Sequence, residues 1–131
     1  MALTAETDTP LPTVVIAQND TRIAQKLAAS LGAHLSGVSI ASGTEELRRL
    51  LEDREVRLAV LDMEMIDLDE VRRLAHASPT LAIVCTQRSP DDRMWIAALN
   101  AGAIEYCHPL DIRAILRTSN IAARYQMPRA A

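Results

Sequence analysis

Five short apolar runs alternate with five segments of helical periodicity along the chain, and few folds accommodate this order. The runs, which are expected to form strands, cover residues 13–18, 35–40, 56–62, 81–85 and 104–107. In the segments that follow, apolar residues recur three or four positions apart, as on one face of an amphipathic helix. Strands that alternate with helices need crossover connections and a parallel sheet covered on both faces. We therefore predict an α/β fold, a doubly wound five-stranded parallel sheet of flavodoxin-like order.

The third run ends abruptly in a lone carboxylate. Residues 58–61 are four consecutive apolar residues without helical spacing, so this strand is expected to be buried on both faces. Asp62 closes it. Ligands of open parallel sheets gather beyond the carboxyl ends of the central strands, so Asp62 is the predicted site. The alternative is that Asp62 only caps the turn after the strand, a common role for aspartate.

Capping residues mark three of the expected helix starts. Residues 19–21 (Asn-Asp-Thr) carry side chains suited to cap the first helix. Ser42 and Glu45 have the spacing of a capping box before the second helix. Ser89, followed by Pro90, is the expected N-cap of the fourth helix.

The composition favours one globular domain in a reducing compartment. The chain has 131 residues, 49% of them hydrophobic, and we expect a flexible leader (1–12), a domain (13–126) and a tail (127–131). No apolar stretch approaches the roughly 20 residues that span a bilayer. Cys85 and Cys107 lie in or beside strand runs, where free buried thiols are common, so a cytoplasmic location is expected.

The charge balance argues against two classes of partner. Fourteen lysine and arginine residues stand against seventeen aspartate and glutamate residues, which gives a formal net charge of −3. Such a chain lacks the basic field that holds nucleic acid or an anionic membrane surface. We therefore expect no direct nucleic-acid partner and no membrane partner.

Flavodoxin-like order also predicts which polar residues lie near Asp62, because it places the first strand beside the third. The polar residues at the carboxyl ends of the first, fourth and fifth strands are Gln18, Asn19, Asp20, Thr86 and His108. A carboxylate can accept a phosphoryl group when the charge of that group is neutralised. Mg²⁺ with oxygen ligands, a nearby cation and a hydroxyl usually do this.

With these residues in place, the sequence resembles the receiver domains of two-component response regulators, over roughly residues 13–126. The residues that carry the resemblance are Leu61, Asp62, Met65, Thr86, Ala101-Gly102-Ala103, Tyr106 and Pro109. The resemblance implies the (βα)5 receiver fold and a role for Asp62 as phospho-acceptor. It also implies that the Thr86 hydroxyl contacts the phosphoryl group and that Tyr106 is the aromatic residue whose rotamer reports the switch.

The sequence departs from this family at the end of the first strand. The family typically has two acids there, whereas this chain has Gln18 and Asn19, with Asp20 one position later. Amide oxygens can bind Mg²⁺ but bring no charge, so we expect a weakened Mg²⁺ site with Asn19, Asp62 and Glu64 as ligands. If Asp20 caps the first helix instead, its oxygens are already engaged.

The family's switch lysine is also missing. Lys26 is the only lysine of the chain and belongs to the first helix, and His108 stands where the family has its lysine. A histidine is cationic only part of the time near neutral pH, so a charge supplied by His108 would depend on pH. The alternative is that His108 is a solvated or hydrogen-bonding residue at the end of its strand.

The fourth helix carries the best candidate for a partner surface. Met94, Trp95 and Ile96 are three large apolar residues in a row, which cannot all face one core. In the family, the face of the fourth helix, fifth strand and fifth helix is where receivers dimerise or meet partners. Trp95 could anchor such a contact, including a homodimer, and Arg113 and Arg117 could bind a partner's acids. The alternatives are that Trp95 folds back as core and that the arginines form a solvated face.

Three hypotheses for the function follow. In the first, a histidine kinase or a phosphotransfer protein phosphorylates Asp62, and the chain signals to a downstream protein or output domain by contact. In the second, an atypical receiver without efficient phosphorylation acts as an interaction module, which the missing acids and lysine favour. An enzyme is disfavoured, because no glycine follows the first strand to hold a phosphate. Although Glu64 stands where an aspartate-based phosphatase has its second carboxylate, the rest of that motif is absent.

Overall fold

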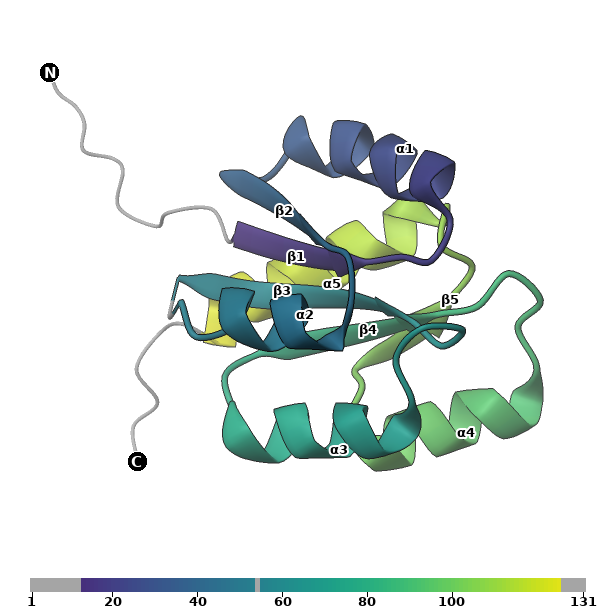
Figure 1. Ribbon diagram of the computed structural model, residues 1–131. Helices are drawn as coiled ribbons and strands as arrows, with labels where there is room; N and C mark the ends of the chain where they lie inside the picture. Colours follow the sequence, from purple (N-terminus) through teal and green to yellow (C-terminus); the bar gives the residue numbers. More distant parts are fainter. Residues whose placement is uncertain (1–12, 54, 126–131) are drawn as a thin grey trace, which may run out of the picture.

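The structure, a computed structural model, describes residues 13–53 and 55–125, which form a parallel sheet between two layers of helices (Figure 1). The strands are β1 (Thr13–Ala17), β2 (Gly37–Ala41), β3 (Val56–Asp62), β4 (Ala82–Thr86) and β5 (Glu105–Cys107). The helices are α1 (Thr21–Gly32), α2 (Thr44–Leu50), α3 (Leu68–Ala77), α4 (Asp92–Ala101) and α5 (Ile112–Tyr125). The strand order β2-β1-β3-β4-β5 confirms the predicted flavodoxin-like α/β fold. The predicted leader and tail lie outside the described residues.

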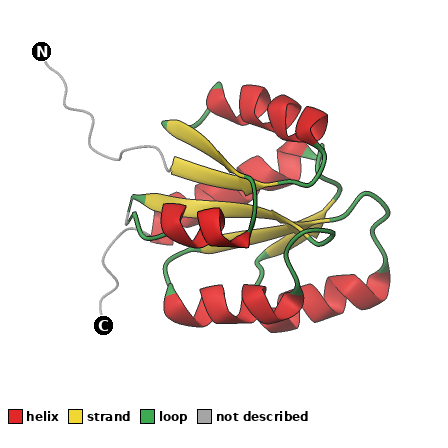
Figure 2. Cartoon of the chain, viewed as in Figure 1, coloured by secondary structure: helices red, strands yellow, loops and turns green. Residues whose placement is uncertain are grey.

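Helices α1 and α5 cover one face of the sheet, and α2, α3 and α4 cover the other (Figures 1 and 2). The central strand β3 contributes side chains to the core on both faces of the sheet. Its residues Leu58 and Val60 pack in the core under α1 and α5, whereas Ala59 and Leu61 pack in the core under the other three helices. All four are fully buried, as the unbroken apolar run predicted. Burying one leucine or valine in this way contributes about 1.5–3 kcal/mol, so this run stabilises β3 from both faces of the sheet.

The second strand begins at Gly37 rather than at Leu35. Leu35 is buried, but its backbone N–H donates to the carbonyl oxygen of Leu31 at 2.9 Å, which continues the end of α1. Its apolar side chain therefore belongs to the helix end and not to the sheet. Gly37 in turn lies so close to β1 that an added Cβ would come within 2.8 Å of the Thr13 side chain.

Two predicted caps are displaced along the chain. The N-cap of α4 is Asp91 and not Ser89: the Asp91 carboxylate accepts from the backbone N–H of Met94 at 2.8 Å. The N-cap of α2 is Gly43, so Glu46 and not Glu45 stands three residues after the cap. Glu46 accordingly accepts from the backbone N–H and the hydroxyl of Ser42, at 2.7 and 2.8 Å.

Helices α3 and α4 approach each other closely at Gly102, the C-cap of α4. Its φ of 119° lies in the left-handed region, and an added Cβ would come 2.5 Å from the Cβ of Ala75. Both the backbone conformation and the packing of the two helices therefore require glycine at this position.

Both cysteines are free and buried, as predicted. Burial is the main reason why the pKa of the Cys85 thiol and that of the Cys107 thiol are each raised to about 12. Thiols that stay protonated are poor nucleophiles, so the two cysteines act as core residues.

None of the helices in the described part of the chain is long and apolar enough to cross a membrane.

The register of the sheet brings the predicted pocket residues together. Asp62 pairs with Thr86 across β3 and β4, and Ala17 pairs with Leu61 across β1 and β3. Gln18, which follows Ala17, therefore lies directly beside Asp62. The carboxyl ends of these strands meet at the right-hand edge of the sheet in Figure 1, the side on which α4 begins.

Candidate functional site

Asp62 lies at this edge with its carboxylate held by three hydrogen-bond donors. The backbone N–H of Asn19 donates to Oδ2 at 2.9 Å, and the Gln18 amide donates to the same oxygen at 3.2 Å. The backbone N–H of Glu64 donates to Oδ1 at 2.9 Å. Asp62 is only 3% exposed. It thus lies beside Gln18 at the carboxyl end of β3, as the topology predicted, and it also caps the turn after its strand.

Gln18 connects Asp62 to Thr86. Its amide nitrogen donates to Asp62 at 3.2 Å, and its amide oxygen accepts from the Thr86 hydroxyl at 3.5 Å, the longer and weaker of the two contacts. An ionised carboxylate only accepts hydrogen bonds, which fixes the NH₂ group of Gln18 toward Asp62. Because all three residues are buried, the side chain forms a polar bridge across the ends of β1, β3 and β4.

Asp20 does not join this bridge. One of its carboxylate oxygens accepts from the backbone N–H groups of Arg22 and Ile23, at 2.9 and 3.3 Å, as the N-cap of α1. The side chain of Asn19 is exposed, and its contact with Asp62 runs through the backbone. The two residues after Gln18 therefore shape the turn rather than add charge to the pocket.

An ion pair between Glu64 and Arg88 lies beside the pocket. Two guanidinium nitrogens of Arg88 donate to the two carboxylate oxygens of Glu64, at 2.9 and 3.2 Å. The bond from Arg88 lowers the pKa of Glu64, and the same bond raises the pKa of Arg88, with smaller contributions from Asp20 and Asp62. Arg88 was missed by the sequence reasoning, although it is the first cation after Thr86.

The side chains near Asp62 do not assemble the ligand set that Mg²⁺ needs. This ion takes octahedral oxygen coordination, usually with one or two carboxylates. Of the predicted ligands, Glu64 is paired with Arg88 and Asn19 contributes only its backbone N–H, which is a donor. No group of three or more His, Cys, Asp or Glu residues that could hold a metal occurs in the part of the chain that the structure describes. As placed, Glu64 would have to leave Arg88, and the Asn19 side chain would have to turn toward Asp62, before these three residues could hold Mg²⁺.

Tyr106 connects β5 to the start of α4. Its hydroxyl donates to the side-chain oxygen of Gln87 at 2.5 Å and accepts from the backbone N–H of Asp91 at 3.1 Å. The residue is buried, and burial raises the pKa of its hydroxyl. Since Gln87 follows Thr86 and Asp91 caps α4, Tyr106 joins the edge of the pocket to the fourth helix. This contact also explains why Asp91, and not Ser89, begins that helix.

His108 is placed away from the predicted pocket contacts. It is exposed, and its Nδ1 accepts from the backbone N–H of Leu110 at 3.0 Å. Among the described residues, no hydrogen bond or ion pair joins His108 to Asp62. The geometry corresponds to the alternative of a hydrogen-bonding residue at the end of its strand.

The predicted partner residues lie on the surface. Trp95 is 47% exposed and Ile96 is 57% exposed, so Trp95 does not fold back as core. Arg113 and Arg117 are exposed on α5. Arg117 lies 3.8 Å from the carboxylate of Glu105, which is a contact within the chain rather than one that awaits a partner's acid.

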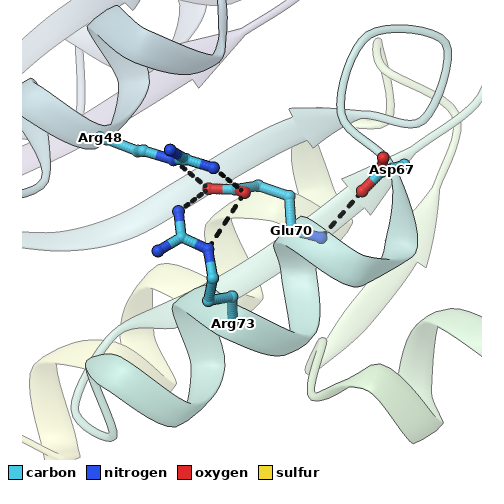
Figure 3. A network of polar contacts seen from close by, with 4 residues as sticks. All are labelled: Arg48, Asp67, Glu70 and Arg73. Atoms are coloured by element: carbon cyan, nitrogen blue, oxygen red, sulfur yellow. Dashed lines mark hydrogen bonds and ion pairs between the residues drawn. The ribbon is translucent and has the colours of Figure 1, made fainter.

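A second buried carboxylate, Glu70 on α3, lies outside the pocket and was also missed by the sequence reasoning (Figure 3). Arg48 on α2 donates to both of its oxygens, at 2.8 and 3.0 Å. Arg73, which lies on α3 like Glu70, donates to the same carboxylate at 2.8 and 3.4 Å. Asp67 caps α3 by accepting from the backbone N–H of Glu70 at 2.9 Å. This cluster fastens α2 to α3.

The fold, as distinct from the sequence, matches known proteins. No protein-family model and no curated protein matches the chain. Among solved structures, it is similar to a two-component response regulator from Clostridium difficile, with a TM-score of 0.75 and 20% identity over 89% of this chain and 99% of that one. It is also similar to a response regulator receiver domain protein from Clostridium thermocellum, with a TM-score of 0.76 and 24% identity over 88% and 97% of the two chains.

A third similar structure is the beryllofluoride-activated NtrC4 receiver domain dimer, with a TM-score of 0.75 and 19% identity over 86% of this chain and 98% of that one. All three similarities extend over nearly the whole of the known domain. The chain therefore has the receiver fold, which confirms the fold that the resemblance implied.

Proposed function

We propose that this protein is a receiver-fold module of two-component signal transduction that acts by protein contact, without phosphorylation of Asp62. The observation that carries the proposal is the Gln18 bridge, which joins the Asp62 carboxylate to the Thr86 hydroxyl. The resemblance implies that a phosphoryl group on Asp62 contacts the Thr86 hydroxyl. In this protein the Gln18 side chain connects the two residues instead. The module is a binding protein of the cytoplasm and not an enzyme.

The charges near Asp62 support this proposal. Phosphorylation would add negative charge to a buried pocket, and such charge needs a cation or a metal ion to neutralise it. Lys26 lies on α1, and Arg88 is already engaged by Glu64. His108 directs its Nδ1 to the backbone of its own turn. Either oxygen of Asp62 would also have to give up hydrogen bonds on phosphorylation, Oδ2 those from Gln18 and Asn19, and Oδ1 that from Glu64.

The proposed contact face is formed by α4, β5 and α5. Tyr106 connects this face to the strand ends, because its hydroxyl contacts Gln87, the residue after Thr86, and the backbone N–H of Asp91 at the start of α4. The expected partners are a downstream protein or output domain, a histidine kinase or phosphotransfer protein that docks without transfer, or a second copy of the chain.

Phosphorylation of Asp62 by a histidine kinase or phosphotransfer protein is the second candidate. The observation that favours it is the placement of Asp62 at the carboxyl edge, in register with Thr86. Gln18 would have to swing out of the pocket for the phosphoryl group to reach the Thr86 hydroxyl.

Beryllofluoride with millimolar Mg²⁺, which mimics an acyl phosphate, separates the two candidates. Trp95 is the only tryptophan, so its fluorescence reports on α4 without a label. We expect no change in this fluorescence and none in the amide spectrum around Asp62. A change that disappears in Asp62→Ala would overturn the proposal and support phosphorylation.

A double variant provides the positive control. Gln18→Asp with Asn19→Asp supplies the two acids that the pocket lacks and removes the bridging amide. We expect it to bind Mg²⁺ at least about tenfold more tightly than the wild type, since carboxylates are the preferred Mg²⁺ ligands. If the wild type binds Mg²⁺ equally well, the bridge does not exclude the metal and the proposal fails.

A further inference from the structure

A hollow of about 290 Å³ opens at the start of α4, on the proposed contact face. Its lining residues are Pro90, Asp91, Asp92, Trp95, Glu105 and Tyr106. The hollow lies between the first turn of α4 and strand β5. It therefore adjoins the Tyr106 contact that joins the pocket to this helix.

Three of the six lining residues are acidic and none is basic. Asp91 and Asp92 also have an ordinary role, because acids stabilise a helix N-terminus. That role does not account for Glu105, which comes from β5. Within the described residues, the Asp92 side chain has no hydrogen-bond or ion-pair partner. One oxygen of the Glu105 carboxylate accepts from the backbone N–H of Tyr106 at 3.0 Å, and the other lies 3.8 Å from the guanidinium group of Arg117. The lining of the hollow therefore carries negative charge, and Arg117 of α5 lies near one of its three acids.

An apolar patch on α4 begins at Trp95, which also lines the hollow. Its members, which we call the α4 patch, are Trp95, Ile96 and Leu99, which lie three or four positions apart or next to each other on the helix and are between 38% and 57% exposed. Large apolar side chains grouped on one surface are typical of a protein contact. Trp95 belongs to both the hollow and the patch, so one ligand could contact the indole and the carboxylates together.

We propose that the hollow binds an arginine side chain of a separate partner protein, and that apolar residues beside this arginine cover the α4 patch. A guanidinium group is planar, so it can stack on the Trp95 indole while its N–H groups donate to Asp92 and Glu105. Lysine offers a point charge and no flat surface, so it fits this site less well. The inference rests on the proposed role of the α4, β5 and α5 face, and it adds the chemistry of the partner.

A pair of short peptides tests this proposal on the full chain. Acetyl-Leu-Arg-Ile-Leu-amide is compared with the same peptide carrying citrulline, which has the shape of arginine without the charge. We expect the arginine peptide to shift the indole N–H signal of Trp95 and to bind at least about fivefold more tightly than the citrulline peptide. Equal binding of the two peptides would overturn the proposal.

Variants of the lining acids locate the site. Asp92→Asn and Glu105→Gln should each weaken binding of the arginine peptide about threefold, and added salt should reduce the difference. Asp69→Asn is the matched control, because Asp69 is an exposed acid in the first turn of α3 and lies outside the hollow. If all three variants bind alike, the arginine does not enter this hollow.

Two further measurements keep the outcomes distinct. If the free chain sediments as a dimer that Arg117→Gln dissociates, a second copy fills the site and a separate partner is excluded. The beryllofluoride experiment tests the pocket at Asp62 independently of any peptide. A response there, together with selective binding of the arginine peptide, would overturn the proposed function and leave the arginine site standing.

Discussion

Asp62 and Glu70 are both buried carboxylates, yet the protein satisfies them in opposite ways. Glu70, 7% exposed, lies between the guanidinium groups of Arg48 and Arg73 (Figure 3). Asp62, 3% exposed, accepts hydrogen bonds from two backbone N–H groups and one amide side chain. No lysine or arginine of the described residues forms an ion pair with it.

The difference separates a structural carboxylate from a functional one. Two arginines around one carboxylate compensate for its lost hydration, and they tie α2 to α3. Neutral dipoles hold a charge less tightly, so the state of Asp62 depends on each of its three donors. The protein fixes its architecture with ion pairs and leaves its pocket to hydrogen bonds that a ligand or a substitution can replace.

Neutralising Glu70 and Asp62 one at a time should give the largest difference in the free energy of unfolding. Glu70→Gln should lower the free energy of unfolding by about 2 kcal/mol, because it replaces charge-assisted bonds from two arginines. The loss stays below that of a fully buried pair, since both arginines are half exposed and can be rehydrated. Asp62→Asn should lower it by less than about 1 kcal/mol, because only neutral donors are affected. Urea denaturation measures both, and equal losses would remove the distinction.

Acid should act on the Glu70 cluster through the same ion pairs. The bond from Arg48, with a smaller contribution from Arg73, holds the pKa of Glu70 below its ordinary value, against the raising effect of burial. A lowered pKa means that the unfolded chain binds the proton more readily than the folded one. This stabilisation is therefore complete above the ordinary pKa of glutamate and is lost as the pH falls through the folded value.

The wild type should accordingly lose stability more steeply than Glu70→Gln as the pH falls from about 5 to about 3. The measurement is a series of urea denaturations across this range. Parallel curves for the two proteins would mean that other carboxylates dominate the acid response and that Glu70 carries no special weight.

The Gln18 bridge should have a smaller effect. Gln18→Met keeps the length of the side chain but removes one donor to Asp62 and the acceptor for the buried Thr86 hydroxyl. We expect a loss of about 1 kcal/mol in the free energy of unfolding, together with a shift of the Thr86 methyl signal in the NMR spectrum. Gln25→Met, on the exposed face of α1, is the control and should change neither. A Gln18→Met protein as stable as the wild type would show that the bridge is incidental.

The fold was predictable because its signals are local. The unbroken run of β3 and the helical stripes fix which residues are buried, and alternation of strand and helix fixes the parallel sheet. The boundaries were less predictable where tertiary contacts decide between local candidates. Ser89 and Asp91 are both good N-caps, and the hydrogen bond from the Asp91 backbone to Tyr106 selects the second.

The site was predictable as a place but not as a set of contacts. The ends of parallel strands bring Gln18, Asp62 and Thr86 to one edge, which follows from topology. That Gln18 turns its amide to Asp62 depends on the register of β1 and β3 and on side-chain orientation. The ion pairs of Glu64 with Arg88 and of Glu70 with Arg48 join residues more than twenty positions apart, and no local pattern indicates them.

The smallest effect on stability is expected at the exposed ion pair between Glu64 and Arg88. This pair tests whether the exposure of an ion pair decides how much it stabilises the protein. Arg88→Gln should leave the free energy of unfolding unchanged within error, because both partners of an exposed pair are readily rehydrated. It should still raise the pKa of the Glu64 carboxyl, since the Arg88 bond is the main reason why that pKa is low. NMR titration of the Glu64 carboxyl carbon measures this shift.

Arg48→Gln is the matched comparison, because it should raise the pKa of Glu70 and also destabilise the protein. If Arg88→Gln destabilised the protein as much as Arg48→Gln does, the pocket would share the ion-pair architecture of the Glu70 cluster, and the contrast between the two carboxylates would fail.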